Sequence, residues 1–232
     1  MKDDKIMTTV YPSECALYLV SPPRFELPQF LPMLEAALAA EGIKAFQLRL
    51  KDADDDEILM AAAAMLPLCR KYDVAFILND RPDLAVKAGM DGVHLGQDDM
   101  GVAEARSIIG HDMVIGVSCH ASKDMGIRAA EAGANYVAFG AFYPTKSKPK
   151  EKVEKWGVPT PEIIEWWSTY TTVPCVAIGG MTAENCAPLV KARTDFIAAI
   201  TSVWEHPNGA GEAVREFKRA IHANNTYRHC EP

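Results

Sequence analysis

Eight short apolar segments recur along this chain, and they limit its fold more than any other feature. Each spans four to six residues and is almost continuous in apolar character. Parallel strands that are buried on both faces have this pattern. The segments are residues 15–20, 45–50, 74–79, 92–95, 114–118, 136–141, 175–180 and 196–201.

Helix-like stretches lie between these segments. Residues 54–71 are rich in Ala, Met and Leu and open with the acidic stretch Asp54–Glu57. Ser122 and Thr182 are predicted to cap two further helices, over residues 122–132 and 182–191. The remaining expected helices cover residues 29–41, 81–88, 102–109, 161–170 and 211–222. Eight strands alternating with eight helices predict an α/β fold, a (β/α)8 TIM barrel.

The domain organisation follows from the same pattern. We expect residues 1–232 to form a single (β/α)8 barrel domain, with a flexible N-terminal extension over about 1–12 and a C-terminal tail over about 224–232. A doubly wound open sheet is an alternative, but no G-x-G-x-x-G motif follows the first strand. The lysine-rich segment 146–155 reads as a loop after the sixth strand, and the sequence leaves open whether it closes as a lid.

Composition disfavours several classes of protein. A chain with 49% hydrophobic residues, 24% charged residues and a net charge of −7 is unlike a disordered segment or a general nucleic-acid binder. No apolar run approaches the roughly 20 residues of a membrane span, and residues 1–9 lack the apolar core of a signal peptide. The six cysteines form no CxxC pair, so we expect buried, reduced thiols. These features predict a cytoplasmic protein without nucleic-acid or membrane partners.

Polar residues at the expected strand ends are the candidates for function, because a barrel gathers its catalytic groups there. Gln47, Arg49 and Lys51 alternate at the end of the second strand, so their side chains point the same way. Two cations beside an amide can hold an anion. The alternative is a polar face on an edge strand, which a closed barrel does not have.

Two carboxylates follow neighbouring strands. Asp80 comes after the third strand and Asp99 after the fourth. Together they could hold Mg²⁺, which prefers oxygen ligands and keeps waters or phosphate oxygens in its other positions. The alternative for each is to cap the following helix. Asp98 suits capping or solvent better than Asp99, and His94 is predicted to be a hydrogen-bonded residue of the barrel rather than a ligand or base.

A second group of residues suits a phosphate. Ser118 ends the fifth strand and could donate a hydrogen bond, while the adjacent Cys119 and His120 are disfavoured as a thiol catalytic pair, since sequence neighbours seldom have that geometry. Loops after the last strands of a barrel commonly bind phosphate through backbone N–H groups. The candidates in this group are Thr145, Ser147, Gly180 and Thr201, whereas Lys148 joins Gln47, Arg49 and Lys51 in the first group. Two anion-binding regions predict two phosphorylated substrates, or one substrate with widely separated phosphates.

Six segments resemble the thiamine-phosphate synthase family. They occur in the family's order over about residues 45–202, and as a set they are specific, although IGG or QLR alone would not be. They read FQLRLK, ILNDRPDLA, DGVHLGQDD, IGVSCH, ANYVAFGAFYPTKSK and VAIGGMTAEN.

The resemblance implies a reaction and a set of roles. The enzymes join 4-amino-2-methyl-5-pyrimidinylmethyl diphosphate to 4-methyl-5-(2-phosphoethyl)thiazole, giving thiamine phosphate and pyrophosphate. By resemblance, the pyrimidine diphosphate would contact Gln47, Arg49, Lys51, Asn79, Ser118 and Lys148. The thiazole phosphate would contact Thr145, Ser147, Gly180, Ile200 and Thr201. Asp80 and Asp99 would hold Mg²⁺. The expected catalytic residues are Arg49, Lys51, Ser118 and Lys148.

Some features depart from the family pattern and leave alternatives open. Ser147 stands where Thr is usual, and the bulky residues 192–196 replace a small, Gly-containing approach to the eighth strand, which could alter the thiazole-phosphate pocket. One alternative is a thiazole tautomerase-like isomerase, in which His120 could shuttle a proton. Another is a non-catalytic barrel that binds a thiamine precursor. The oligomeric state stays open, with a homo-oligomer as one option.

Overall fold

The computed structural model describes residues 14–145 and 155–225. Within this part, eight parallel strands close into a barrel in which β1 to β8 follow one another in chain order. The strands are β1 (Ala16–Val20), β2 (Ile43–Leu48), β3 (Ala75–Asn79), β4 (Gly92–Leu95), β5 (Val114–His120), β6 (Tyr136–Gly140), β7 (Cys175–Ile178) and β8 (Phe196–Ala199). The expected (β/α)8 barrel is confirmed, and the predicted strand ends agree with the observed ones to within two residues.

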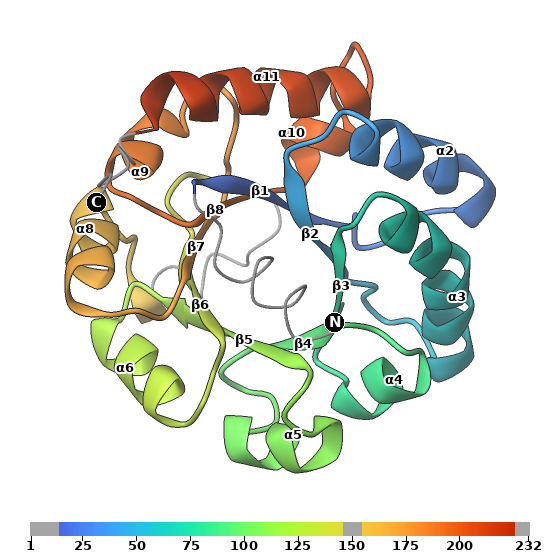
Figure 1. Cartoon of the computed structure of the whole chain (residues 1–232), viewed down its shortest axis with the longest axis horizontal. Helices are drawn as coiled ribbons and strands as arrows, with labels where there is room; N and C mark the ends of the chain where they lie inside the picture. Colours follow the sequence, from blue (N-terminus) through green and yellow to red (C-terminus); the bar gives the residue numbers. More distant parts are fainter. Residues whose placement is uncertain (1–13, 146–154, 226–232) are drawn as a thin grey trace, which may run out of the picture.

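Helices surround the ring of strands, as Figure 1 shows. They are α2 (Leu27–Leu38), α3 (Asp55–Lys71), α4 (Pro82–Lys87), α5 (Val102–Ile109), α6 (Lys123–Glu131), α8 (Pro161–Tyr170), α9 (Ala187–Lys191), α10 (Thr201–Trp204) and α11 (Ala210–Asn224). The short α10 was not predicted, because residues 200–201 read as the end of the eighth strand. The expected extension 1–12 and most of the tail 224–232 lie outside the described residues.

Local hydrogen bonds explain where the helices begin. The side chain of Asp54 accepts from the backbone N–H of Glu57 at 2.8 Å, and the Glu57 carboxylate accepts from the N–H of Asp54, so the two residues form a capping box at the start of α3. Ser122 caps α6 as predicted, by accepting from the backbone N–H of Met125 at 3.2 Å.

The predicted Thr182 cap is wrong, because α9 begins only at Ala187. The side chain of Asn185 organises a turn instead. Its Oδ1 accepts from the backbone N–H of Thr182 and its Nδ2 donates to the carbonyl of Gly180, both at 2.9 Å. A side chain that bonds local backbone groups in this way competes with a helix for them.

The core has two apolar layers. Alternate side chains of a strand point to opposite faces, so one strand can serve both layers. The layer between strands and helices contains Phe46, Phe76 and Trp167, and the layer inside the barrel contains Tyr18 and Phe196. At the carboxyl ends the interior becomes polar: Gln47 pairs with Val20 across β1 and β2, and Asn79 pairs with His94 across β3 and β4. Parallel pairing therefore brings polar residues from distant segments to one end.

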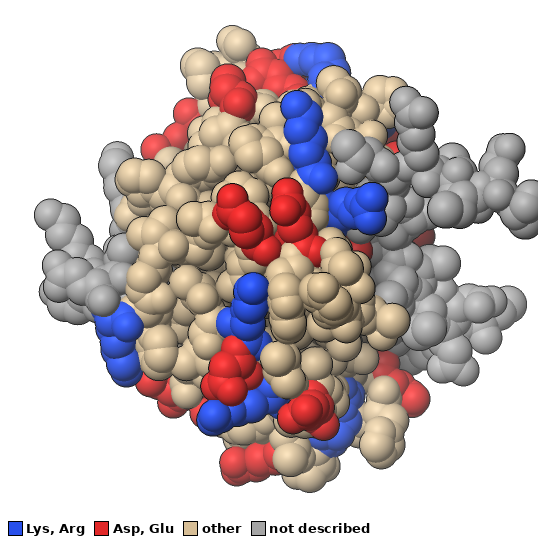
Figure 2. All heavy atoms as spheres, turned by 90° about the vertical axis from the view of Figure 1, so that its left-hand side faces the viewer, with Lys and Arg blue, Asp and Glu red and all other residues tan. Residues whose placement is uncertain are grey.

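The surface carries charges of both signs. Figure 2 shows the face on the side of α6, α8 and α9, where acidic and basic side chains are interspersed and neither forms a continuous patch among the described atoms. None of the described helices has the length and apolar character that crossing a bilayer would require. The described cysteines are all buried and free, as expected for five of the six thiols, while Cys230 lies outside the described residues.

Candidate active site

A cavity of about 640 Å³ opens at the carboxyl ends of the strands, and each of the eight strands contributes a residue at or just beyond its end. The structure brings together in its wall most of the residues that the sequence singled out. They are Gln47, Arg49, Lys51, Asn79, Asp80, Asp99, Ser118, Thr145, Gly180, Ile200 and Thr201. Ser147 and Lys148 lie outside the described residues, and so does almost all of the lysine-rich loop.

The second strand supplies an amide and two cations on one side of the cavity. Gln47 is only 4% exposed, and its side-chain Nε2 has no hydrogen-bond partner within the described part of the chain. A buried donor without a partner is costly unless a ligand satisfies it. Arg49 is half-buried, and burial lowers the pKa of its guanidinium while the nearby Asp80 opposes that shift. Lys51 is exposed at the rim.

Asp80 and Asp99 face each other across the loops that follow β3 and β4. Burial, together with the neighbouring Asp99 as a hydrogen-bond partner and as a like charge, raises the pKa of Asp80 to about 7. The backbone of Asp80 is left-handed, with φ of 64°, a conformation that is uncommon for residues other than glycine. Such strain is often held at functional sites. The two carboxylates are therefore kept close despite their repulsion.

Helix capping does not explain either carboxylate. The residue that caps α4 is Arg81, and the residue that caps α5 is Gly101. The side chain of Asp99 instead accepts from the backbone N–H of Gly96 at 2.7 Å, within its own loop. Asn79 donates a short hydrogen bond to the Asp80 carboxylate. The capping alternative is therefore wrong for both residues.

The charge on Asp80 should destabilise the metal-free protein above neutral pH. In an unfolded chain an aspartate has a pKa of about 3.9, whereas the folded value is about 7. Between these values the folded protein keeps a proton that the unfolded chain has lost, so the free energy of unfolding falls as the pH rises. At pH 8 we expect Asp80→Asn to stabilise the metal-free protein by about 1 kcal/mol after allowance for solvent screening, or about 2–4 °C in melting temperature.

Thermal unfolding with a chelator present checks this expectation. The stabilisation by Asp80→Asn should shrink as the pH is lowered from 8 to 5, because the wild-type carboxyl is then increasingly protonated. A melting temperature below wild type at pH 8 would contradict the assignment of the repulsion to Asp80.

Ser118 and two histidines form the wall next to the carboxylates. Ser118 Oγ lies 2.9 Å from His94 Nε2, and the backbone carbonyl of Ser118 accepts from the side chain of Gln97 at 2.5 Å. His94 is thus a hydrogen-bonded barrel residue, as predicted. His120 is 7% exposed and stacks on Trp156, with ring centroids 5.2 Å apart and planes 2° from parallel. This stack joins the end of β5 to the far side of the lysine-rich loop.

The Cys119 thiol does not act as a nucleophile in this arrangement. Its side chain is fully buried, its sulfur donates to the carbonyl of Val117, and burial raises its pKa to about 12. A reactive thiol needs a lowered pKa and access to its substrate.

The opposite side of the cavity is made of backbone and hydroxyl groups. Gly179 and Gly180 have φ of 108° and 61°, and a Cβ on Gly180 would lie 2.5 Å from the carbonyl oxygen of Pro144. Thr201 and Ser202 are the first residues of α10, and the first N–H groups of a helix have no partners within it. The hydroxyl of Ser202 is buried without a partner among the described residues. Ser202 was not predicted as a site residue, although it has a hydroxyl and directly follows the predicted Thr201.

The unusual residues 192–196 lie at the other end of the barrel, because they lead into β8 and include its first residue. Thr194 is fully buried, and its hydroxyl shares one hydrogen between the carbonyls of Cys175 and Phe196, at 3.2 and 3.0 Å. Asp195 accepts from the backbone N–H of Cys175 at 2.8 Å. Arg193 takes the left-handed backbone that glycine often provides, with φ of 67°. None of these residues lines the candidate active site in the described structure. The expectation that they could alter the thiazole-phosphate pocket is therefore not supported.

Sequence comparisons place the chain among known proteins. A family model described as thiamine monophosphate synthase matches residues 17–203. The chain is 50% identical over 210 residues to a thiamine-phosphate synthase of Rhodospirillum centenum, covering 90% of this chain and 99% of that protein. It is 46% identical over 211 residues to a thiamine-phosphate synthase of Erythrobacter litoralis, covering 89% and 95%.

A structural comparison agrees. The thiamine phosphate pyrophosphorylase from Pyrococcus furiosus superposes with a TM-score of 0.78 at 27% sequence identity, covering 90% of this chain and 96% of that one. The residues matched by the family model begin in β1 and end in α10, so they include every strand that builds the cavity. The chain belongs to the thiamine monophosphate synthase family.

Proposed function

We propose that this chain is a thiamine-phosphate synthase, a transferase that joins 4-amino-2-methyl-5-pyrimidinylmethyl diphosphate to 4-methyl-5-(2-phosphoethyl)thiazole and releases pyrophosphate. One observation carries the proposal beyond family membership. A single cavity combines cations and facing carboxylates on one side with a glycine and hydroxyl wall on the other. Two phosphorylated heterocycles that must meet would use such a divided site.

Mg²⁺ fits the carboxylate pair. The described cavity wall carries Arg49 and Lys51 against three carboxylates, so attraction to these side chains alone would not hold a diphosphate. Asp80 and Asp99 repel each other, and a divalent cation between them would remove that repulsion. Two carboxylates suffice, because Mg²⁺ takes its other ligands from water and substrate phosphates. When bound, the ion would neutralise charge on the diphosphate oxygens.

The side chains of the cavity suit a dissociative transfer. The C–O bond of the diphosphate ester breaks, and its electron pair leaves with pyrophosphate. Arg49, Lys51 and Ser118 stabilise the negative charge that grows there, most strongly because Arg49 is partly withdrawn from water. The lone pair of the thiazole nitrogen then forms the new C–N bond with the pyrimidine methylene. No protein nucleophile is needed, which agrees with the buried, protonated Cys119 thiol.

The thiazole phosphate is assigned to the opposite wall, around Gly180 and Thr201. Glycine lets an anion approach the backbone closely. The N–H groups of Thr201 and Ser202, which have no partner within α10, can donate to the phosphate together with the hydroxyl of Ser202. Thr145 and Ile200 complete this side. The roles of Ser147 and Lys148 stay predictions, since both lie outside the described residues.

The rival functions use less of this site. A thiazole tautomerase-like isomerase or a non-catalytic precursor-binding barrel needs no diphosphate cradle, yet Arg49, Lys51, Asn79, Asp80 and Asp99 all line the cavity. The names of the relatives also favour the synthase. A single barrel domain in the cytoplasm, acting on two small phosphorylated substrates, remains part of the proposal, and the oligomeric state remains open.

Pyrophosphate release is the direct test. Purified protein with Mg²⁺ and both substrates should release pyrophosphate and form thiamine phosphate in equal amounts. Reactions that lack either substrate or contain a chelator are the controls, and they should form no thiamine phosphate. Isomerisation of a thiazole precursor without pyrophosphate release would favour the tautomerase, and binding without turnover would favour the non-catalytic barrel.

A further inference from the structure

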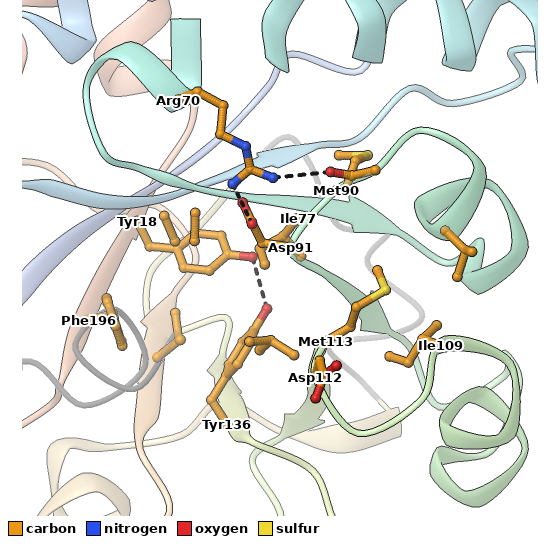
Figure 3. Close-up of a pocket in the computed structure, with 16 residues that line it drawn as sticks. Tyr18, Arg70, Ile77, Met90, Asp91, Ile109, Asp112, Met113, Tyr136 and Phe196 are labelled. Carbon is orange, nitrogen blue, oxygen red and sulfur yellow. Dashed lines mark hydrogen bonds and ion pairs between the residues drawn. The ribbon is translucent and has the colours of Figure 1, made fainter. Parts of the chain in front are cut away.

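A line of hydrogen-bonding side chains crosses the barrel interior beneath the candidate active site. The hydroxyl oxygens of Tyr18 and Tyr136 are 2.9 Å apart, and Figure 3 shows the two phenols meeting at a second cavity. Tyr136 Oη lies 2.9 Å from His94 Nδ1, and His94 Nε2 lies 2.9 Å from Ser118 Oγ. The tyrosines line the second cavity, while His94 and Ser118 line the candidate active site, so the four side chains join the two.

The fold makes room for this line. Tyr136 projects from β6 against Gly116 of β5, where a Cβ would lie only 1.9 Å from the phenol ring. Tyr18 and Tyr136 are 3% and 4% exposed. Burial raises the pKa of both phenols, so each hydroxyl keeps its hydrogen at neutral pH. Every hydroxyl of the line therefore has one hydrogen to donate.

The number of donors gives the line a direction. Within the described residues, the Tyr18 hydroxyl has Tyr136 as its hydrogen-bonding partner and no further acceptor. If Tyr18 donates to Tyr136, then Tyr136 donates to His94 Nδ1, and His94 carries its hydrogen on Nε2 and donates to Ser118. The opposite direction would leave the hydrogen of the buried Tyr18 hydroxyl without an acceptor among the described residues, so that only a water in the second cavity could accept it, whereas the first direction satisfies every donor within the protein.

The direction decides what Ser118 can do. When His94 donates to Ser118, the Ser118 hydrogen stays available for a ligand in the cavity. When Ser118 donates to His94, its hydroxyl can only accept from a ligand. Unprotonated phosphate oxygens are acceptors, so they need the first arrangement.

We propose that Tyr18, Tyr136 and His94 form a directional hydrogen-bond relay that holds the Ser118 hydroxyl as a donor to the departing diphosphate. The proposal rests on the proposed function for the identity of that anion. The two tyrosines and His94 are positioning residues, because they act through Ser118. Pre-oriented donors lower a barrier since they need not reorganise when charge develops.

Nitrogen-15 NMR of histidine-labelled protein tests the direction of the relay without any substrate. The chain has six histidines, and the His94 signals are assigned as those lost in His94→Gln. Two-bond proton–nitrogen correlations distinguish the tautomers. We expect neutral His94 to carry its hydrogen on Nε2. A hydrogen on Nδ1 would overturn the proposal.

Kinetics test whether the relay assists turnover. Tyr136→Phe should lower kcat about tenfold, a fraction of the 10²–10³ that losing a whole transition-state donor costs, with both KM values near wild type. Tyr18→Phe should have a smaller effect, because Tyr136 can still donate to His94. His94→Gln should retain more kcat than His94→Leu, since its amide nitrogen can donate to Ser118. The control is Tyr72→Phe. In the wild-type protein the Tyr72 hydroxyl donates to Glu35 outside the barrel, so its loss should leave kcat unchanged.

The outcomes separate the relay from the proposed function. An unchanged kcat in Tyr136→Phe, or equal losses in His94→Gln and His94→Leu, would reject the relay even if the wild-type protein is an active synthase. Absence of pyrophosphate release from the wild-type protein would reject the proposed function, while the His94 tautomer would still decide the direction of the hydrogen bonds.

Discussion

Replacing Asp80 or Asp99 by alanine should reduce the rate of pyrophosphate release about a thousandfold. The physical reason is the loss of a ligand for the ion that neutralises the leaving diphosphate, an effect of about 4 kcal/mol on the barrier. Both carboxylates line the cavity, and burial together with Asp99 holds the pKa of Asp80 at about 7, so the pair is poised to take up a cation. Turnover should be measured over a range of Mg²⁺ concentrations, and we expect neither variant to saturate at the wild-type concentration.

Asp83→Ala is the matched control for this experiment. Asp83 lies in the first turn of α4, close to Asp80 in the chain, but its carboxylate pairs with Arg81 at the surface. Surface pairs of this kind contribute little, so the control should keep wild-type turnover. The melting temperature should show that all three variants remain folded. Near-normal turnover in both Asp80→Ala and Asp99→Ala would reject the metal assignment.

Replacing Arg49 by glutamine should lower kcat/KM about 10²–10³-fold, the usual cost of losing one contact to developing charge. The guanidinium lines the cavity, where burial lowers its pKa and Asp80 opposes that shift. It can contact two diphosphate oxygens at once. Arg49→Lys keeps the charge but not the paired geometry, so it should recover only part of the activity. Steady-state pyrophosphate release measures both variants.

Arg24→Gln controls for the loss of a positive charge. Arg24 pairs with Asp52 at 3.3 Å, with the two side chains 78% and 79% exposed. It does not line the described cavity, so we expect activity near wild type. If Arg24→Gln and Arg49→Gln lost activity equally, the loss of a positive charge anywhere on the protein would explain the result better than a contact between Arg49 and the diphosphate.

Much of the candidate site could be predicted because a parallel barrel orders its strand ends. Once residues 45–50, 74–79 and 114–118 are read as strands, Arg49, Asp80 and Ser118 must come to the same end, whatever their separation in sequence. The capping box at Asp54 was predictable for a similar reason, since it depends on residues only three apart. Local patterns and parallel strand direction carry this information.

Other features depended on contacts between distant segments. Tyr18 and Tyr136 read as ordinary members of apolar strands, and only the closed barrel sets their hydroxyls against each other and beneath His94. The start of α9 was misplaced because the Asn185 side chain bonds the backbone N–H of Thr182 and the carbonyl of Gly180. Neither contact leaves a periodic signal in the sequence.

The sequence by itself determined the barrel, the end at which its functional groups gather, and the residue types that could hold two phosphates. Apolar periodicity and strand direction are local properties, so they can be read without coordinates. Only the tertiary structure decided that residues 192–196 lie away from the site, that Asp80 and Asp99 face each other, and that two tyrosine hydroxyls and His94 form a line to Ser118. These depend on the register and closure of the barrel, which bring together side chains that no local pattern relates.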